Sequence, residues 1–182
     1  MRLGVLDVGS NSAQLQVVDA HGGAPPLATY AVKEPTLLGG AFAADGRIDP
    51  AGVDRVVRAV SAAMAAADRF GVDQLYAFVT SAIRDATNRA EIMDRLERES
   101  GLRPQLLTGE DEALLTYFAA HRWYGWRTGR LLLLDIGGGS MEIVRVGTPN
   151  PNSRCRCRWA PAGCAGPSCT TTRRCGTACT RG

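Results

Sequence analysis

Acidic residues are absent from residues 148–182, and cysteine is absent from everything before them. The 182-residue chain has a net charge of +3, and residues 148–182 contribute six arginines, so residues 1–147 carry a net −3. All six cysteines fall in the same stretch, but they form no Cys-x-x-Cys pair and no histidine accompanies them. The stretch therefore lacks the ligand spacing of a zinc site, and beside a cytosolic, reducing core a disulfide framework is not expected.

Long apolar runs are also absent. Hydrophobic residues make up 45% of the chain, which is enough for an ordinary core, yet no run reaches the length that spans a bilayer. Asp7 stands where a signal peptide needs its apolar centre. We therefore expect a cytoplasmic protein with no membrane partner.

The composition of residues 148–182 is typical of GC-rich DNA read out of frame, since it is rich in Arg, Cys, Pro, Gly, Ala and Thr. A shift of one base allows the codons of residues 159–164 to encode Leu-Gly-Ala-Gly-Arg-Leu. We interpret the stretch as a disordered frameshift product that begins between residues 144 and 154. The alternatives are a metal-binding or a nucleic-acid-binding appendage. Nucleic acid is not an expected partner, because no aromatic platform accompanies the arginines.

Two apolar runs end in an acid and a glycine-rich turn. Residues 3–12 read LGVLDVGSNS and residues 131–142 read LLLLDIGGGSME. Each predicts a strand, a carboxylate and a turn whose backbone N–H groups cradle a phosphate. A carboxylate beside phosphate requires a cation between them, so the pair predicts two phosphate turns facing one Mg²⁺-phosphate ligand. Two ordinary glycine-rich hairpins are the alternative. We call residues 9–12 the first turn and residues 137–140 the second turn.

The periodicity of the chain predicts the order βββαβαβα followed by a new β-hairpin. We expect residues 1–126 to form one layered α/β domain, residues 127–147 to begin a truncated second domain, and residues 148–182 to be the tail. Residues 34–46 predict a surface loop that covers a site. The expected strands are 3–8, 12–19, 27–33, 75–79, a short one ending at 107, 131–136 and 141–146, and the expected helices are 49–70, 89–100 and 109–123.

Four ordered motifs resemble one known family. They are DVGSNS at 7–12, TSAIRDATN at 80–88, GEDEALLTY at 109–117 and DIGGGSME at 135–142. Together they resemble the exopolyphosphatase / guanosine pentaphosphate phosphatase family of the actin-like ATPase superfamily, over residues 1–147. The resemblance implies an α/β fold, with an actin-like ATPase (ribonuclease H-like) βββαβαβα domain followed by the first hairpin of an incomplete second domain.

The resemblance also implies a chemistry. The family uses Mg²⁺ to release terminal phosphate from inorganic polyphosphate or the 5′ γ-phosphate of guanosine pentaphosphate, and its full-length members are expected to be homodimers. Glu112 matches the general base, while Asp135 and Glu142 match catalytic acids that, with Asp7, support the metal. The residues that match phosphate contacts are Gly9, Ser10, Asn11, Ser12, Arg84, Gly137, Gly138, Gly139 and Ser140.

Structural roles remain open for several of these residues. Glu112 lies in a helix first turn, where acids are stabilised whether or not they are catalytic. Arg84 can be a solvated charge beside Asp85, and Asn88 can be a helix cap. Because most of the second domain is missing, we expect activity to be absent or very weak, and residues 131–134 to expose an apolar edge strand. A non-catalytic polyphosphate-binding or guanosine-polyphosphate-binding module is the alternative function.

Overall fold

The chain divides into two compact units, Met1–Leu107 and Thr108–Gly182. The computed structural model of the protein describes residues 1–23, 27–125, 131–137, 141–146, 154–157 and 169–171. The boundary falls at 107/108, earlier than the 126/127 boundary predicted from the sequence. The difference arises because helix α4 (Gly109–Tyr124) contacts strands β7 (Met141–Val146) and β8 (Arg154–Cys157), which belong to the second unit.

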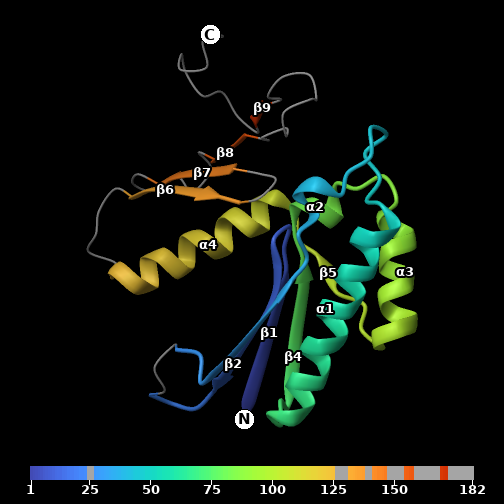
Figure 1. The fold of residues 1–182 in the computed structure, drawn as a ribbon. Helices are drawn as coiled ribbons and strands as arrows, with labels where there is room; N and C mark the ends of the chain where they lie inside the picture. The colour runs from blue at the N-terminus through green and yellow to red at the C-terminus, as the bar shows by residue number, and fades with distance from the viewer. Residues whose placement is uncertain (24–26, 126–130, 138–140, 147–153, 158–168, 172–182) are drawn as a thin grey trace. The chain divides into compact units, whose positions relative to one another are not determined.

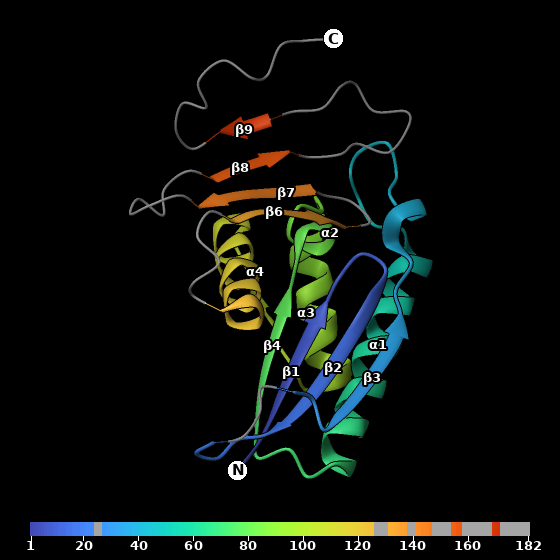
Figure 2. The same cartoon turned by 90° about the vertical axis from the view of Figure 1, so that its left-hand side faces the viewer.

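The first unit contains a mixed sheet with the strand order β3-β2-β1-β4-β5. The antiparallel part is formed by β1 (Arg2–Val8), β2 (Ser12–Asp19) and β3 (Tyr30–Pro35), and the strands parallel to β1 are β4 (Gln74–Val79) and β5 (Gln105–Leu106). Because β1 and β4 are parallel neighbours, their carboxyl ends meet at the same edge of the sheet (Figure 2). The first turn follows β1 at that edge.

Helices α1 (Pro50–Arg69) and α3 (Arg89–Ser100) pack on one face of this sheet (Figures 1 and 2). Alternate strand residues point toward them, and Leu6, Leu15 and Val17 are fully buried. The remaining residues of the same strands, such as the exposed Val5, face the other way, as the two-residue period of a strand requires. Burial of this alternating set fixes the register of β1 and β2, and with it the position of the first turn.

The helix boundaries follow the predicted signals. Asp49 caps α1, since its carboxylate accepts a hydrogen bond from the Gly52 N–H. Gly71 and Gly101 follow α1 and α3 with φ values of +63° and +70°, a left-handed conformation that glycine adopts without strain. Two short helices were not predicted, because they are shorter than the window in which helical periodicity can be read. They are the 3₁₀ helix η1 (Leu38–Gly40) and α2 (Ser81–Arg84).

The second unit contains α4 and a sheet in the order β6-β7-β8-β9. The hairpin of β6 (Leu131–Ile136) and β7 lies where the sequence predicted it. The prediction of a disordered tail is wrong at β8 and at β9 (Cys169–Thr171), which extend this sheet. An unpaired strand edge can recruit an extended segment of any origin, and β7 offers such an edge to β8. The out-of-frame origin stays a prediction, and the rest of 148–182 lies outside the described residues.

The apolar edge strand predicted at residues 131–134 is confirmed. Strand β6 is at the edge of its sheet, and its residues Leu132 and Leu134 are 59% and 53% exposed. Among the described residues, no helix combines the length and apolarity needed to cross a membrane. Exposed leucines on an edge strand make self-association along that edge the expected hazard.

Replacement of both leucines with threonine is expected to raise the concentration at which the protein aggregates. Threonine keeps the β propensity of the strand but removes apolar side chains from the exposed face. Light scattering measured during concentration of the protein tests this expectation. Leu27→Thr is the control, because Leu27 is equally exposed, at 56%, but lies outside the strands. Equal aggregation thresholds for Leu132→Thr/Leu134→Thr and Leu27→Thr would contradict the prediction.

Candidate phosphate and metal site

The first turn is a tight connection between β1 and β2. The Gly9 N–H donates to the Ser12 carbonyl at 2.9 Å, Ser10 is buried, and Asn11 is exposed at the tip. Gly9 does not have a positive φ, so the left-handed freedom of glycine is not its reason here. A Cβ at Gly9 would meet the Ser12 carbonyl oxygen at 3.4 Å and Thr80 Oγ1 at 3.8 Å, which are ordinary contacts. The fold therefore tolerates a methyl group at Gly9, and close approach by a ligand, as the reason for glycine, stays a prediction.

Residues 36–38 donate hydrogen bonds to carbonyl groups of the first turn. Thr36 Oγ1 donates to the Gly9 carbonyl at 2.8 Å, and the Leu38 N–H donates to the Ser10 carbonyl at 2.6 Å. Thr36 and Leu38 are fully buried, so this part of the predicted surface loop is interior. Thr36 was not predicted as a site residue, because a single hydroxyl residue after a strand carries no signal of a contact 27 residues away.

The one-turn helix α2 lies beside the first turn. The Thr80 N–H donates to the Val8 carbonyl at 3.2 Å, which fixes the start of α2 at the carboxyl end of β1. Arg84 at the end of α2 is buried rather than solvated. Its Nη1 donates to the Leu107 carbonyl at 2.7 Å, and its Nε lies 3.4 Å from Asp85 Oδ1. The guanidinium therefore fixes the chain at the end of β5, a role that the sequence did not indicate.

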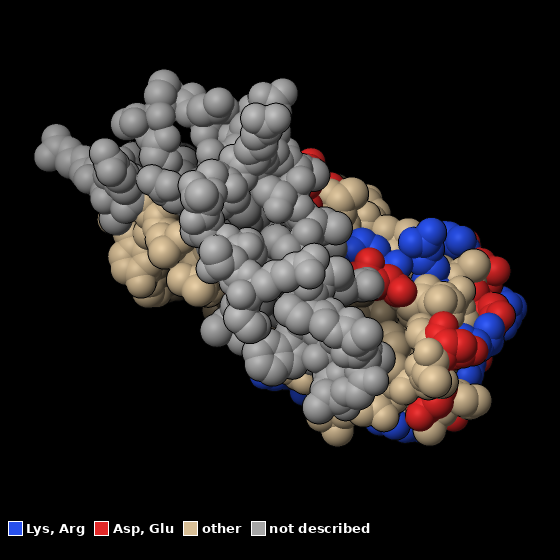
Figure 3. Space-filling model, turned by 90° about the horizontal axis from the view of Figure 1, so that it is seen from above, with Lys and Arg blue, Asp and Glu red and all other residues tan. Residues whose placement is uncertain are grey.

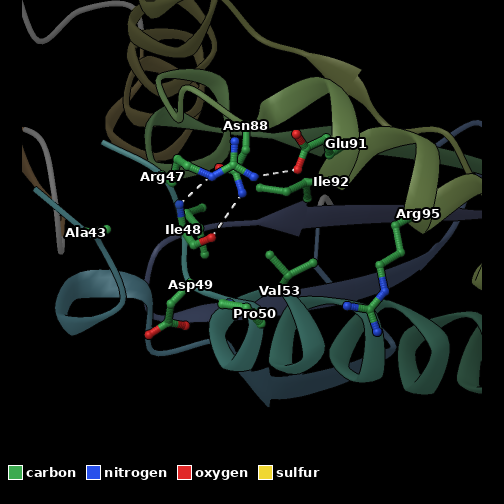
Figure 4. Close-up of a pocket in the computed structure, with 10 residues that line it drawn as sticks. All are labelled: Ala43, Arg47, Ile48, Asp49, Pro50, Val53, Asn88, Glu91, Ile92 and Arg95. Atoms are coloured by element: carbon green, nitrogen blue, oxygen red, sulfur yellow. Dashed lines mark hydrogen bonds and ion pairs between the residues drawn. The ribbon is translucent and has the colours of Figure 1, made fainter. Parts of the chain in front are cut away.

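Asn88 occupies the N-cap position of α3, but its side chain does not cap the helix. Instead its Oδ1 accepts from the Ile48 N–H and its Nδ2 donates to the Ile48 carbonyl, both at 3.0 Å (Figure 4). The prediction that the Asn88 side chain caps α3 is wrong, because both hydrogen-bonding groups of its amide bond to the buried main chain of Ile48. Asn88 and Ile48 line a pocket of about 350 Å³, at whose rim Arg47 pairs with Glu91 at 2.7 Å.

On the part of the face that is coloured in Figure 3, basic and acidic side chains lie next to each other. On α3, Arg95 pairs with Asp54 and with Glu99 at 2.7 Å each. Arg103 pairs with Asp94 at 3.0 Å. These arginines are therefore paired with carboxylates of their own surface.

Glu112 lies in the first turn of α4 in the second unit. Thr108 caps this helix, and its hydroxyl accepts from the Asp111 N–H at 3.1 Å. Glu110 and Asp111 are exposed, whereas Glu112 is half-buried. The helix N-terminus stabilises all three acids. The partial burial of Glu112 sets it apart from its two neighbours, and its role as a general base stays a prediction.

The β6–β7 hairpin places two of the predicted acids opposite each other. Asp135 pairs in the ladder with Glu142, one position before the end of β6. Directly opposite residues of an antiparallel pair share one face of the sheet. Gly137 is described and exposed, while Gly138, Gly139 and Ser140 lie outside the described residues. No cluster of three or more His, Cys, Asp or Glu side chains suited to a metal is found in the part of the chain that the structure describes.

The predicted site residues are divided between the two units. The first turn, Asp7 on the last part of β1, and Arg84 belong to the sheet edge of the first unit. Glu112, Asp135 and Glu142 belong to the second unit. Each unit contains one antiparallel strand pair with an acidic residue near the end of its first strand, as the sequence motif indicated.

This fold is the α/β fold of the actin-like ATPase class. The chain belongs to the Ppx/GppA phosphatase family, whose model matches residues 17–154. It is similar to exopolyphosphatase 1 of Mycobacterium tuberculosis, with 46% identity over 143 residues, which is 79% of this chain and 42% of that protein. It is also similar to the guanosine-5′-triphosphate,3′-diphosphate pyrophosphatase of Aeromonas hydrophila, with 29% identity over 76% of this chain and 28% of that protein.

Solved structures show the same relationship. The crystal structure of the Aquifex aeolicus Ppx/GppA family member matches with a TM-score of 0.68 and 28% identity, over 81% of this chain and 47% of that chain. An exopolyphosphatase from Cytophaga hutchinsonii matches with a TM-score of 0.76 over 94% of this chain and 51% of that chain, and at 23% identity it shows the fold alone. The chain spans less than half the length of the curated relatives it matches.

Proposed function

We propose that the site residues serve Mg²⁺-dependent hydrolysis of a terminal phosphoanhydride bond. The observation that carries the proposal is the ladder pairing of Asp135 with Glu142 immediately before a glycine-rich turn. Two carboxylates on one face of a hairpin repel each other, and a cation relieves the repulsion. Mg²⁺ suits such a pair, since it is held by one or two carboxylates, with water and phosphate oxygens as the other ligands. Asp135 and Glu142 are the residues of the second unit that would hold it.

Each further residue has a role in this chemistry. The backbone N–H groups of Ser10, Asn11 and Ser12 and the Arg84 guanidinium bind phosphate oxygens. Glu112 accepts a proton from a water molecule whose oxygen attacks the terminal phosphorus, and the bond to the bridging oxygen breaks as the shortened chain leaves with the electron pair. A bound Mg²⁺ supplies neutralisation of the phosphate charge.

The relatives support polyphosphate as the first candidate substrate. The chain is 46% identical to a protein named as an exopolyphosphatase and 29% identical to one named as a guanosine-polyphosphate pyrophosphatase. Because it spans 42% of the former, we propose that the 182-residue chain binds phosphate chains but turns them over very slowly or not at all. A binding module without turnover is the second candidate function, favoured by the separate core of the first unit.

Calorimetric titration with tripolyphosphate and Mg²⁺ is expected to show saturable binding that Gly9→Ala weakens about tenfold or more, because a methyl group occupies space where phosphate approaches the turn. The added Cβ makes ordinary contacts in the protein, so the thermal midpoint is expected to stay the same. Gly22→Ala is the matched control, since a Cβ there has no neighbour within 4 Å. Absence of binding by the unmodified chain, or equal affinities of the two variants, would overturn the proposed phosphate site.

Phosphate release from polyphosphate, measured in the same samples, separates the enzyme from the binding module. We expect little or no release by this chain. Release that Glu112→Gln abolishes, while the neighbouring control Glu110→Gln preserves it, would show that the chain is an active hydrolase and that our expectation of inactivity is wrong. Binding of tripolyphosphate is expected to survive Glu112→Gln, because the base acts on water.

A further inference from the structure

The carbonyl groups of the first three residues of the first turn accept hydrogen bonds from one neighbouring segment. The Gly9 carbonyl accepts from Thr36 Oγ1 at 2.8 Å, and the Ser10 carbonyl accepts from the Leu38 N–H at 2.6 Å. The Asn11 carbonyl accepts from the N–H groups of Thr36 and Leu37, at 3.0 and 3.2 Å. Three successive peptide carbonyls are therefore bound by residues 36–38.

This arrangement determines where the N–H groups of the turn point. The peptide bonds of the described chain are trans, and in a planar trans peptide the C=O and the following N–H point in opposite directions. Binding of the carbonyls of Gly9, Ser10 and Asn11 on one side directs the N–H groups of the three following residues to the other side. Successive N–H groups on one side form an anion-binding concavity.

Residues 36–38 are themselves held in an unusual conformation. Leu37 has φ 47° and ψ 51°, the left-handed region that a residue with a branched side chain rarely adopts, and its side chain is exposed. Arg55 from α1 donates through Nε to the Thr36 carbonyl at 2.9 Å and through Nη2 to the Leu37 carbonyl at 3.1 Å. A strained conformation persists only where its surroundings determine it, and such positions concentrate at functional sites.

We propose that Thr36, with Arg55 behind it, is a positioning residue that orients the backbone N–H groups of the first turn toward phosphate. The inference rests on the proposed function, since it concerns how that same site binds its ligand. Neither side chain touches the ligand. Thr36 acts by holding the Gly9 and Asn11 carbonyls, and Arg55 acts by holding the carbonyls of residues 36 and 37. The arrangement supplies the orientation before the ligand arrives, so binding does not have to bear the cost of ordering the turn.

Tripolyphosphate titrations of Thr36 variants test the proposal. Thr36→Val keeps the branched shape but removes the hydroxyl, and we expect it to weaken binding about tenfold, which corresponds to about 1.4 kcal/mol. Thr36→Ser restores the donor and is expected to recover most of the affinity. Thr29→Val is the control, because the Thr29 hydroxyl bonds to Asp19 at 3.0 Å at an exposed position of the same unit. Arg55→Lys is also expected to weaken binding, since lysine cannot hold two carbonyls as a fork. The loss is expected to be smaller than in Thr36→Val, because Arg55 acts on the turn only through residues 36 and 37.

Amide NMR spectra provide a readout that a purely structural role would leave unchanged. In the unmodified chain, tripolyphosphate is expected to shift the Ser10 and Asn11 amide resonances, and in Thr36→Val the shift is expected to be lost. Unchanged affinity and unchanged shifts in a folded Thr36→Val would overturn the positioning role while the proposed function stands. A failure of Thr36→Ser to recover binding would also overturn it. Absence of binding by the unmodified chain would overturn the proposed function and the positioning role together.

Discussion

Replacement of Asn88 with leucine is expected to lower the free energy of unfolding of the first unit by about 3 kcal/mol. Asn88 is buried and exchanges two hydrogen bonds of 3.0 Å with the main chain of Ile48, which is also buried. Leucine fills a similar volume but can neither accept from the Ile48 N–H nor donate to the Ile48 carbonyl. Each buried polar group that loses its partner costs about 1–3 kcal/mol, and the burial that leucine adds offsets part of this.

Urea unfolding followed by far-ultraviolet circular dichroism measures this effect, because α1 and α3 belong to the first unit. Tryptophan fluorescence does not report on it, since all three tryptophans lie beyond residue 107. Thr87→Val is the control, because the Thr87 hydroxyl makes an exposed bond of 3.3 Å to the Asp45 carbonyl, and a change within about 0.5 kcal/mol is expected. Similar urea midpoints for Asn88→Leu and Thr87→Val would show that the two hydrogen bonds between Asn88 and Ile48 do not stabilise the first unit as expected.

The sequence was sufficient to predict the elements whose signals are local, namely a regular spacing of apolar residues, a cap, or a short motif. The period of the apolar residues gave α1, and capping signals at Asp49 and Gly71 gave its ends. Both acid–glycine hairpins were predicted because an alternating strand, an acid and a turn are adjacent in sequence. Strand β3 was placed three residues early, at 27, because its bounds are set by pairing with β2 from Ser12 to Val17 rather than by its own residues.

Contacts between distant residues could not be predicted in this way. Thr36 meets Gly9 across 27 residues, and Asn88 meets Ile48 across 40. A hydroxyl or an amide in a loop has many possible partners, and local sequence does not choose among them. The family motif included Asn88 without revealing that its amide holds a loop. The left-handed conformation of Leu37 was equally hidden, because glycine and asparagine are the residues that signal it.

Arg84 has a structural role that the sequence did not indicate, and its role as a phosphate contact stays a prediction. Its guanidinium is buried and holds the Leu107 carbonyl at 2.7 Å. Strand β5 is only two residues long, so this bond is one of few that fix the end of the first unit. A substitution that keeps the positive charge and one that removes it therefore distinguish the bond to Leu107 from a phosphate contact.

Arg84→Lys and Arg84→Met are both expected to lower the free energy of unfolding of the first unit by about 2 kcal/mol, because neither residue reproduces the charged hydrogen bond to Leu107. Their affinities for tripolyphosphate are expected to differ. Lysine keeps a positive charge near the first turn, so we expect a loss of about tenfold for lysine and about a hundredfold for methionine.

Titration at several salt concentrations sharpens the comparison. A contact between Arg84 and phosphate predicts that Arg84→Met reduces the salt dependence of binding, because one charge that the ligand meets is gone. Arg89→Lys is the matched control, since exposed Arg89 donates to the Arg84 carbonyl at 3.0 Å without lying at the turn, and it is expected to bind as the unmodified chain does. Equal affinity and equal salt dependence of the lysine and methionine variants would mean that Arg84 only fixes β5, and that phosphate at the first turn is bound by backbone N–H groups alone.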